Sequence, residues 1–362
     1  MKKRQRIFVT DCEGPISKND NAFELMSRIV PNGDRIFALI SRYDDVLADV
    51  VKKRGYKAGD TLRLILPFMR AYGATNQLFR DYSSQNVLLV PGADETLRSV
   101  NALMPSFIVS TSYEQYILSL CDVTGFPKEN VYCTRLDIDK YHLPEGEANK
   151  IKRIAEELST MQMIDVPSNV VSLDDFPKDS RETVSRLDDI FWRKLFEMQA
   201  GKMIKEVNPV GGYEKANAVK DIAKKTGADL PNIIYVGDSI TDVDPFRLVR
   251  SAGGLTVSFN GNRYAVREAE IAVMSHHTCI TTVLAEVFNS FGKRKILDLA
   301  DDWTLDMIKS FCSPSLFEKY ERIVAEKPVR VEKVTSSNME KIASESSAFR
   351  KTVRGEAVGK LG

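Results

Sequence analysis

The sequence predicts an α/β protein with a mainly parallel sheet, and three observations support this. First, short apolar runs typical of buried strands alternate along the chain with segments of helical periodicity. Second, acidic or hydroxyl residues follow several of these runs directly. Third, the 362 residues exceed the size at which one core usually stops growing, so one large domain with additions is expected. The predicted strands are 6–10, 87–90, 106–109, 131–134, 233–236 and 255–258.

Two of the predicted strands end in paired carboxylates. Asp11 and Glu13 follow the first strand, and Asp238 and Asp242 follow the fifth. Ligands of parallel sheets bind outside the carboxyl ends of the strands, which brings these side chains to one edge. Carboxylate oxygens are ligands that Mg²⁺ takes, usually together with substrate phosphate oxygens and water. The sequence therefore indicates metal-assisted phosphate chemistry.

The third predicted strand and one helix supply further groups that such chemistry needs. Ser110 and Thr111 directly follow the strand 106–109 and place hydroxyl donors at its carboxyl end. Lys215 stands at the head of a helical pattern, where its ammonium group can neutralise a carboxylate and a phosphate together. Taken alone, Ser110 suits a helix N-cap or a turn, and Lys215 suits a solvated helix. The ordered combination of all four pieces is the informative signal.

In order, these pieces are an Asp-x-Glu-Gly, an apolar run ending in Ser, a lone Lys and a Gly-Asp-x-x-x-Asp. This order resembles motifs I to IV of the haloacid dehalogenase superfamily, and the resemblance covers the core of the chain. It implies a Rossmann-like core. The helical segment after the first motif and the spacing of Lys215 look most like the phosphoserine phosphatase group. The layout is also similar to archaeal relatives labelled as subunit R of an energy-converting hydrogenase, although no residue here shows hydrogenase chemistry.

The resemblance implies a role for each motif residue. Asp11 would be the nucleophile that forms an aspartyl phosphate, since an ionised carboxylate needs no base. Glu13 would protonate the leaving oxygen and then activate water. Ser110, Thr111 and Lys215 would bind the phosphoryl oxygens. The superfamily usually has Asp at the position of Glu13, so the balance between hydrolysis and phosphoryl transfer stays open.

The same resemblance implies a metal site and a weaker substrate site. Mg²⁺ would be bound by Asp11, the backbone carbonyl of Glu13 and Asp238, with Asp242 supporting it directly or through water. Without the cation, a phosphate dianion would approach several carboxylates, each pair of unit charges costing about 4 kcal/mol at ~4 Å. In the phosphoserine phosphatase group a carboxylate after motif I grips the substrate's amino group. Asp20 is the nearest match here, with Glu24 behind it.

The predicted organisation is a core interrupted by two helical insertions and followed by an extension. The segment between motif I and the next core element resembles a C1-type cap, which would exclude water and select the substrate. The second insertion is helical in pattern, unlike the sheet-containing C2 caps of relatives, and suggests a decoration that makes a partner surface. The predicted parts are core 1–15, 87–137 and 206–292, cap 16–86, second insertion 138–205 and C-terminal extension 293–362.

The last part of the chain has two interpretations. Beyond Pro328 the sequence is rich in Ser, Lys and Glu. Met339, Ile342, Phe349 and Val353 fit one face of an amphipathic helix that docks on a protein partner or a second copy of the chain. A partly ordered tail is the alternative.

Composition excludes several other classes of function. The formal net charge is +1 and the basic residues are spread along the chain, so nucleic acid is not expected as the partner. The basic N-terminal residues precede only a short strand, too brief for a signal peptide or a membrane span, and cytoplasm is the expected location. The five cysteines are scattered without Cys-x-x-Cys spacing, so neither a disulfide framework nor a zinc site is expected.

The sequence thus favours a Mg²⁺-dependent phosphatase that acts on a small phosphorylated metabolite through an aspartyl phosphate. A phosphotransferase is one alternative. A catalytically idle interaction subunit, using the second insertion and the tail for binding, is the other. The substrate and the oligomeric state cannot be read from the residues.

Overall fold

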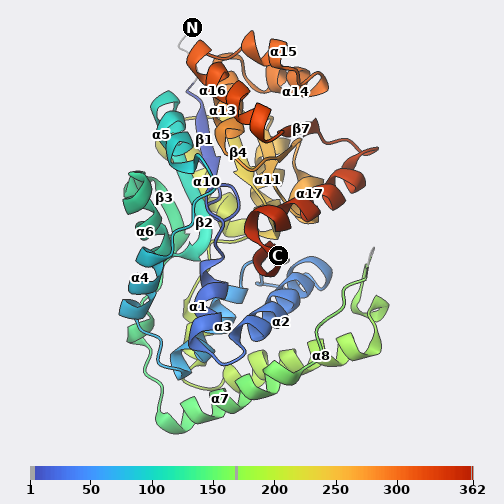
Figure 1. Ribbon diagram of the computed structural model, residues 1–362. Helices are drawn as coiled ribbons and strands as arrows, with labels where there is room; N and C mark the ends of the chain where they lie inside the picture. The colour runs from blue at the N-terminus through green and yellow to red at the C-terminus, as the bar shows by residue number, and fades with distance from the viewer. Residues whose placement is uncertain (1–4, 168–169, 360, 362) are drawn as a thin grey trace.

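A seven-stranded sheet forms the centre of the computed structural model, which describes residues 5–167, 170–359 and 361 (Figure 1). The strand order is β3-β2-β1-β4-β5-β6-β7. All neighbouring strands pair in parallel except β7, which runs antiparallel to β6. The α/β fold with a mainly parallel sheet is thereby confirmed. The strands are β1 (Ile7–Thr10), β2 (Ser106–Tyr113), β3 (Val131–Thr134), β4 (Ile233–Gly237), β5 (Leu255–Phe259), β6 (Ile271–Met274) and β7 (Arg330–Lys333).

Helices cover both faces of the sheet, which explains why its central strands are apolar runs rather than alternating patterns. Ile7 and Val9 of β1 pack in one hydrophobic cluster with α10 (Tyr213–Thr226) and α11 (Val243–Ser251). Phe8, which points the opposite way, packs with α5 (Ala93–Leu103), α6 (Glu114–Thr124) and α13 (Cys279–Phe291). All four residues of β1 are buried, so this strand is held rigidly from both sides.

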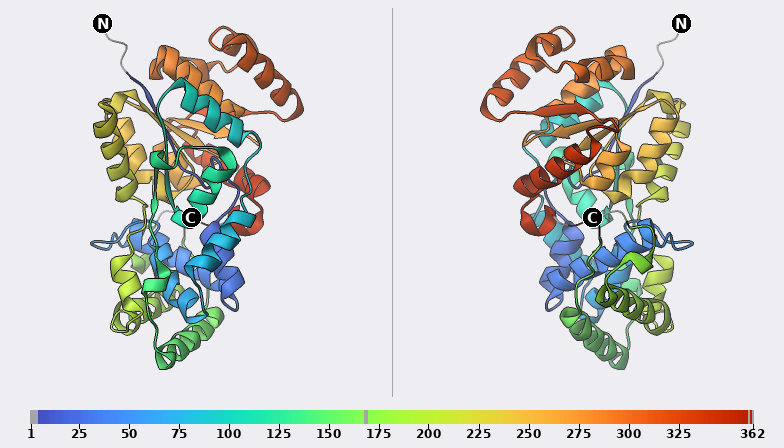
Figure 2. Two further views of the ribbon diagram at one scale, coloured as in Figure 1. Left: turned by 90° about the vertical axis from the view of Figure 1, so that its left-hand side faces the viewer. Right: turned by 90° about the vertical axis from the view of Figure 1, so that its right-hand side faces the viewer.

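A separate helical body lies beyond the carboxyl ends of the strands and occupies the lower part of Figures 1 and 2. It combines helices from both sides of β2 and β3 in the sequence. These are α1 (Asn21–Ile29), α2 (Gly33–Asp45), α3 (Thr61–Ala71), α4 (Asn76–Gln85), α7 (Glu145–Thr160), α8 (Lys178–Asp189) and α9 (Gly201–Glu206).

The two predicted insertions share one hydrophobic core within this body. Phe191, in the π-helical turn that follows α8, stacks on Tyr43 of α2 at 5.9 Å between ring centroids. The same ring meets Phe68 of α3 edge-on at 6.2 Å. The Tyr43 hydroxyl donates a hydrogen bond of 2.5 Å to Asp188. We expected the segment 138–205 to be a decoration that makes a partner surface. Its apolar face instead packs against the cap.

One predicted strand, 87–90, does not join the sheet. It pairs instead with the linker that leaves motif I, where Lys18 N donates to Leu88 O at 2.7 Å and Val90 N donates to Ile16 O at 2.9 Å. The prediction was wrong because the run pairs with this linker, although Val90 packs in the hydrophobic cluster beside the sheet. Two strands, β6 and β7, were missed. β2 is also longer than expected, since it continues through the predicted motif II residues to Tyr113.

The C-terminal extension returns to the core. Its helices are α14 (Lys293–Asp301), α15 (Leu305–Lys309), α16 (Pro314–Glu326), α17 (Met339–Arg354) and α18 (Glu356–Gly359). Helix α17 packs on β6 and on α12 (Arg263–Glu268), burying Ile342 and Ala343 with Val266 and Ala272. The Ser346 hydroxyl donates 2.7 Å to Gly261 O. The predicted amphipathic helix exists, and its buried face docks on its own chain.

Candidate active site

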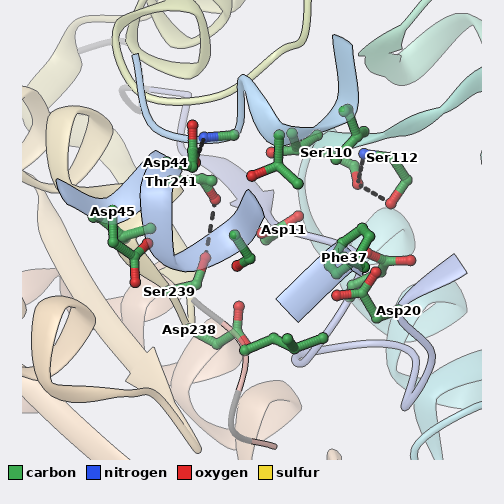
Figure 3. A pocket seen from close by; sticks show the side chains of 18 of the residues that line it. Asp11, Asp20, Phe37, Asp44, Asp45, Ser110, Ser112, Asp238, Ser239 and Thr241 are labelled. Atoms are coloured by element: carbon green, nitrogen blue, oxygen red, sulfur yellow. Dashed lines mark hydrogen bonds between the residues drawn. The ribbon is translucent and has the colours of Figure 1, made fainter. Parts of the chain in front are cut away.

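A small cavity of about 100 Å³ lies where the strand ends, the cap and the C-terminal extension meet (Figure 3). Its walls come from β1, β2 and β4 on the core side, from α2 and α3 on the cap side, and from α17. The lining residues are Asp11, Glu13, Asp20, Phe37, Ser41, Asp44, Asp45, Gly59, Thr61, Leu62, Ser110, Thr111, Ser112, Asp238, Ser239, Ile240, Thr241, Arg350, Arg354 and Leu361.

Asp11 is fixed at the end of β1 by backbone and side-chain contacts. Its amide donates 2.8 Å to Val236 O of the neighbouring strand β4. One carboxylate oxygen accepts from Cys12 N at 2.6 Å, and the other from Lys215 Nζ at 2.5 Å. Burial raises the pKa of Asp11 to about 7, although the charge of Lys215 opposes this shift. The carboxylate is therefore held in one orientation beside a cation.

Lys215 is the fully buried centre of an ion-pair network. It sits in the first turn of α10 and donates to Asp11 and, at 2.8 Å, to Asp242 Oδ1. Burial alone would lower the pKa of Lys215, but the two carboxylates outweigh it, and the pKa lies above its ordinary value. The ammonium group therefore stays charged at neutral pH, as a phosphate-binding residue requires.

Asp242 is saturated with donors. Its Oδ1 accepts from Lys215 and from the Tyr235 hydroxyl, each at 2.8 Å. Its Oδ2 accepts from the amides of Asp238 and Ser239 at 2.9 and 3.1 Å. These four contacts suit a carboxylate that positions Lys215 and the loop after β4. Of the two expected roles of Asp242, support of the metal directly or through water, these contacts favour the indirect one.

Glu13 lies on the cap side of Asp11. Its Oε1 accepts 2.8 Å from Asn21 N. Burial and the nearby Asp20 raise the pKa of Glu13 well above its ordinary value, with Arg354 opposing. A carboxyl group with a raised pKa retains a proton near neutral pH and can give it to a leaving group.

The two predicted substrate carboxylates lie in different places. Asp20 lines the cavity and caps α1 by accepting 3.0 Å from Phe23 N. Burial raises its pKa, and Arg354 opposes this shift. Glu24 does not line the cavity, because Asn19 Nδ2 donates to its oxygens at 2.8 and 3.0 Å and holds the carboxylate aside.

The predicted phosphate-binding hydroxyls sit on an irregular stretch of β2. The register with β3 shifts between Val109 and Tyr113, which turns the strand next to the site. The buried Ser110 hydroxyl donates to Ser112 Oγ and accepts from Ser112 N, both at 3.2 Å (Figure 3). The Thr111 hydroxyl donates 3.1 Å to Val210 O, so in this arrangement it ties β2 to the chain before α10.

Asp238 closes the core side of the site and meets the C-terminal helix. Its carboxylate Oδ2 pairs with Arg350 Nη1 and, at 3.3 Å, with Arg354 Nη1. Gly14 lies directly against the same oxygen with a φ of +101°, and a Cβ there would come within 2.0 Å of it. A side chain at position 14 would therefore displace Asp238.

The donor set fits a hard divalent cation. Carboxylate oxygens of Asp11, Asp238 and Asp242 lie within 4.8 Å of one another, and all three residues are buried. All are oxygen donors, as Mg²⁺ prefers. Because Asp242 is already saturated, Asp11 and Asp238 are the side chains best placed to hold the ion.

Four charged residues of the cavity wall were not anticipated: Asp44, Asp45, Arg350 and Arg354. Asp44 accepts 2.6 Å from the Tyr56 hydroxyl and 2.8 Å from Gly59 N. Burial raises its pKa to about 8, with Asp60 adding to the shift. Asp45 is also buried, and its Oδ2 accepts no hydrogen bond within the described residues. Nothing in the local sequence separates these residues from ordinary charged helix positions.

Comparison with known proteins gives the family. A model of haloacid dehalogenase-like hydrolases matches residues 101–286, a segment that includes Ser110, Lys215, Asp238 and Asp242. The chain belongs to this family. The Asp11 motif lies before the matched segment. The parallel pairing of β1 with β2 and β4 brings this motif close to the three motifs within the segment.

Among solved structures, this haloacid dehalogenase-like hydrolase is similar to gene product AF1437 from Archaeoglobus fulgidus. The two share 25% sequence identity with a TM-score of 0.79 over 99% of each chain, so the similarity extends to the insertions and the extension. A substrate-bound phosphoserine phosphatase complex and an apo phosphoserine phosphatase match at 13% and 12% identity, with TM-scores of 0.43 and 0.41. Each match covers 78% of this chain and 98% of the other.

The search of curated proteins found no match. Within the part of the chain that the structure describes, none of the helices is both long and apolar enough to span a bilayer.

Proposed function

We propose that this protein is a Mg²⁺-dependent phosphatase that cleaves a small phosphorylated metabolite through an aspartyl phosphate on Asp11. The observation that carries the proposal is the convergence of Asp11, Ser110 and Asp238 on one small cavity, with Lys215 paired to Asp11. Lys215 does not line the cavity but reaches it through Asp11. Membership of a hydrolase family supports the same class of reaction.

The residues divide the first step between them. An Asp11 oxygen attacks phosphorus in line, a new oxygen–phosphorus bond forms, and the bond to the leaving oxygen breaks. Glu13 gives its proton to that oxygen, a task for which its raised pKa suits it. Lys215 and the Ser110 hydroxyl stabilise negative charge on the phosphoryl oxygens.

The second step releases phosphate. Glu13, now ionised, accepts a proton from water as the water oxygen attacks phosphorus. The bond to Asp11 then breaks, and Asp11 returns as a carboxylate. Asp11 and Asp238 would hold Mg²⁺, whose charge would let the phosphate dianion approach these carboxylates.

The size of the cavity supports a small substrate. Its volume is about 100 Å³. Walls from the core, the cap and α17 surround it. A compact phosphate ester fits this space better than a macromolecule.

The test is phosphate release by the purified protein. We expect hydrolysis of a generic aryl phosphate and of some members of a small phosphometabolite panel in Mg²⁺, and loss of activity in EDTA that returns with excess Mg²⁺. Full activity in the chelator would remove the metal from the mechanism. Inactivity on every phosphate tested, with a folded protein and Mg²⁺ present, would favour an interaction subunit instead.

A further inference from the structure

The two carboxylate oxygens of Asp238 have different surroundings. Every hydrogen bond and ion pair that the described residues make to this carboxylate ends on Oδ2, from Arg350 Nη1 and from Arg354 Nη1. Arg350 Nη1 also donates 3.3 Å to Asp238 O, so it contacts both the side chain and the backbone of this residue. The backbone of Gly14 closes a further side of Oδ2, where a Cβ would have no room. Oδ1 is therefore the oxygen that Asp238 can offer to a cation in the cavity.

The two guanidinium groups are anchored by contacts other than those to Asp238. Helix α17, which carries them, docks on the core through the hydrogen bond from the Ser346 hydroxyl to Gly261 O. Arg354 Nε donates 3.1 Å to Lys18 O, and its Nη2 donates to Asn19 O. Both arginine side chains are only 4% exposed. In Figure 1 the end of α17 lies between the sheet and the helical body. The extension thus fixes the arginines, and the arginines fix Oδ2.

The other side chain best placed to hold the metal is constrained as well. One oxygen of Asp11 accepts from Cys12 N at 2.6 Å, and the other accepts from Lys215 Nζ at 2.5 Å. A carboxylate oxygen has two lone pairs, so each can still give one to a cation. Neither Asp11 nor Asp238 presents two unengaged oxygens to the same ion. The site is therefore built from single oxygens rather than from chelating carboxylates.

This arrangement affects the two common hard cations differently. Mg²⁺ requires a near-octahedral shell and is usually held by one or two carboxylates together with water and phosphate oxygens. Ca²⁺ is larger, takes about 6–8 oxygen ligands and readily accepts both oxygens of one carboxylate. Occupation of Oδ2 removes a ligand that Ca²⁺ would use and that Mg²⁺ does not need.

We propose that Arg350 and Arg354 are positioning residues that restrict Asp238 to binding through one oxygen, and that they thereby set the preference of the site for Mg²⁺ over Ca²⁺. They act through Asp238. Both arginines lie outside the residues that the family model matches, so a part of the chain beyond that segment completes the metal site. The inference rests on the proposed function for the location of the metal.

The experiment measures metal binding and not turnover. Isothermal titration calorimetry gives the Kd of Mg²⁺ and of Ca²⁺ for the wild type and for Arg350→Gln, with no phosphate ester present. Glutamine is too short to reach Oδ2 from the same backbone position. Loss of one positive charge strengthens the binding of both divalent ions to a similar degree, so the ratio of the two Kd values isolates the contact with Oδ2. We expect the ratio of the Ca²⁺ Kd to the Mg²⁺ Kd to fall about 10-fold, mainly through tighter binding of Ca²⁺.

Matched variants separate this role from simple docking of α17. Arg267→Gln removes an arginine that pairs with Glu340 of α17 at 3.1 Å, outside the cavity. Ser346→Ala removes a buried hydrogen bond of the same helix. Both should keep the wild-type ratio. Arg350→Lys retains a charged donor and should lower the ratio by a smaller factor, which also provides the test if Arg350→Gln does not fold. Asp238→Asn should strongly weaken the binding of both ions.

The outcomes are distinct, once circular dichroism and thermal unfolding establish which variants are folded. The inference fails if loss of Arg350 changes both Kd values by the same factor or if the docking variants lower the ratio equally. It also fails if Asp238→Asn binds both ions as tightly as the wild type. Arginine-dependent selectivity in a protein that hydrolyses no phosphate ester would overturn the proposed function and leave this inference standing. Mg²⁺-dependent hydrolysis with an unchanged ratio in Arg350→Gln would do the reverse.

Discussion

The cavity has two sides that use charge differently. The catalytic edge, on the core side, consists of Asp11, Glu13, Ser110, Lys215 and Asp238. The cover, on the cap and extension side, consists of Asp44, Asp45, Arg350 and Arg354. In the edge, Asp11 and Lys215 are tied by several short contacts to strand ends and to each other. In the cover, Asp45 Oδ2 and Arg350 Nε are buried without hydrogen bonds.

The two sides therefore differ in how far their polar groups are preorganised for a ligand. The edge is preorganised, because its groups already have the contacts that fix their direction. The residues of the cover also have partners, but two of its buried atoms, Asp45 Oδ2 and Arg350 Nε, form no hydrogen bond within the described residues, and Asp45 Oδ2 only lies 3.9 Å from Arg42 Nη1. Catalysis should therefore depend most steeply on the edge, whereas the cover should affect selectivity and the stability of the fold.

The largest expected effect is at the edge. Asp11→Asn should reduce turnover to background, because an amide is neither a nucleophile nor an anionic metal ligand, while the near-isosteric residue preserves the fold. Beryllofluoride, which mimics a phosphoryl group on a carboxylate, should bind the wild type and not the variant, as measured by fluorine NMR. Equal binding to both proteins would show that Asp11 is not the attacked position.

The next effect concerns Glu13, where edge and cover meet. Glu13→Gln should keep affinity for Mg²⁺ but slow turnover by roughly 10²- to 10⁴-fold, the range of general acid–base catalysis. The loss should shrink for esters with good leaving groups, which need little protonation in the first step when that step limits the rate. A loss that is equal across a series of leaving groups would contradict the assignment of Glu13 as the acid.

The smallest effect is on stability and belongs to the cover. Burial raises the pKa of Asp45 to about 7, against an ordinary value near 3.8. Between these values the folded chain retains a proton that the unfolded chain has lost, so the free energy of unfolding falls as pH rises from about 4 to 7. Asp45→Asn removes this dependence. It should be about 2–4 kcal/mol more stable than the wild type at pH 8 and nearly equal to it at pH 4.

Urea unfolding at both pH values provides the measurement. Asp298→Asn, at an exposed position of α14, is the matched control and should show no such difference. If Asp45→Asn is destabilised at pH 8, the charges of Arg42 and Arg263 outweigh the burial of the Asp45 carboxylate, and the contrast between edge and cover is weakened.

The edge could be predicted from the sequence because each of its residues follows a local signal. Asp11 and Asp238 come directly after apolar runs that become β1 and β4, and parallel pairing then brings their ends together. Ser110 lies at the end of a third such run. Lys215 was recognised only by its order among the others, since a buried lysine and a solvated one look alike in a helical pattern.

The cover could not be predicted, because tertiary packing alone decides which face of a helix meets the cavity. The expected apolar face of α17 consists of Met339, Ile342, Phe349 and Val353. Of these only Ile342 is buried, and the buried face continues through Ser346 and Arg350. Arg350 lies on the buried face of α17, but an arginine in a sequence pattern is assigned to the exposed face of a helix. The misassignment of 87–90 as a strand of the sheet also arises from tertiary packing, because this segment pairs with a linker and not with the sheet.

The ion pairs and hydrogen bonds of Arg354 have a consequence for the timing of biosynthesis. Its hydrogen bond to Lys18 joins residues 336 positions apart. Ribosomes add about 5–20 residues per second, so Arg354 is made on the order of 20 to 70 seconds after Lys18. During that interval the nascent chain carries Glu13 and Asp20 without the Arg354 charge that later favours their ionised forms. The site therefore acquires its full set of charges only after residue 354 has been made.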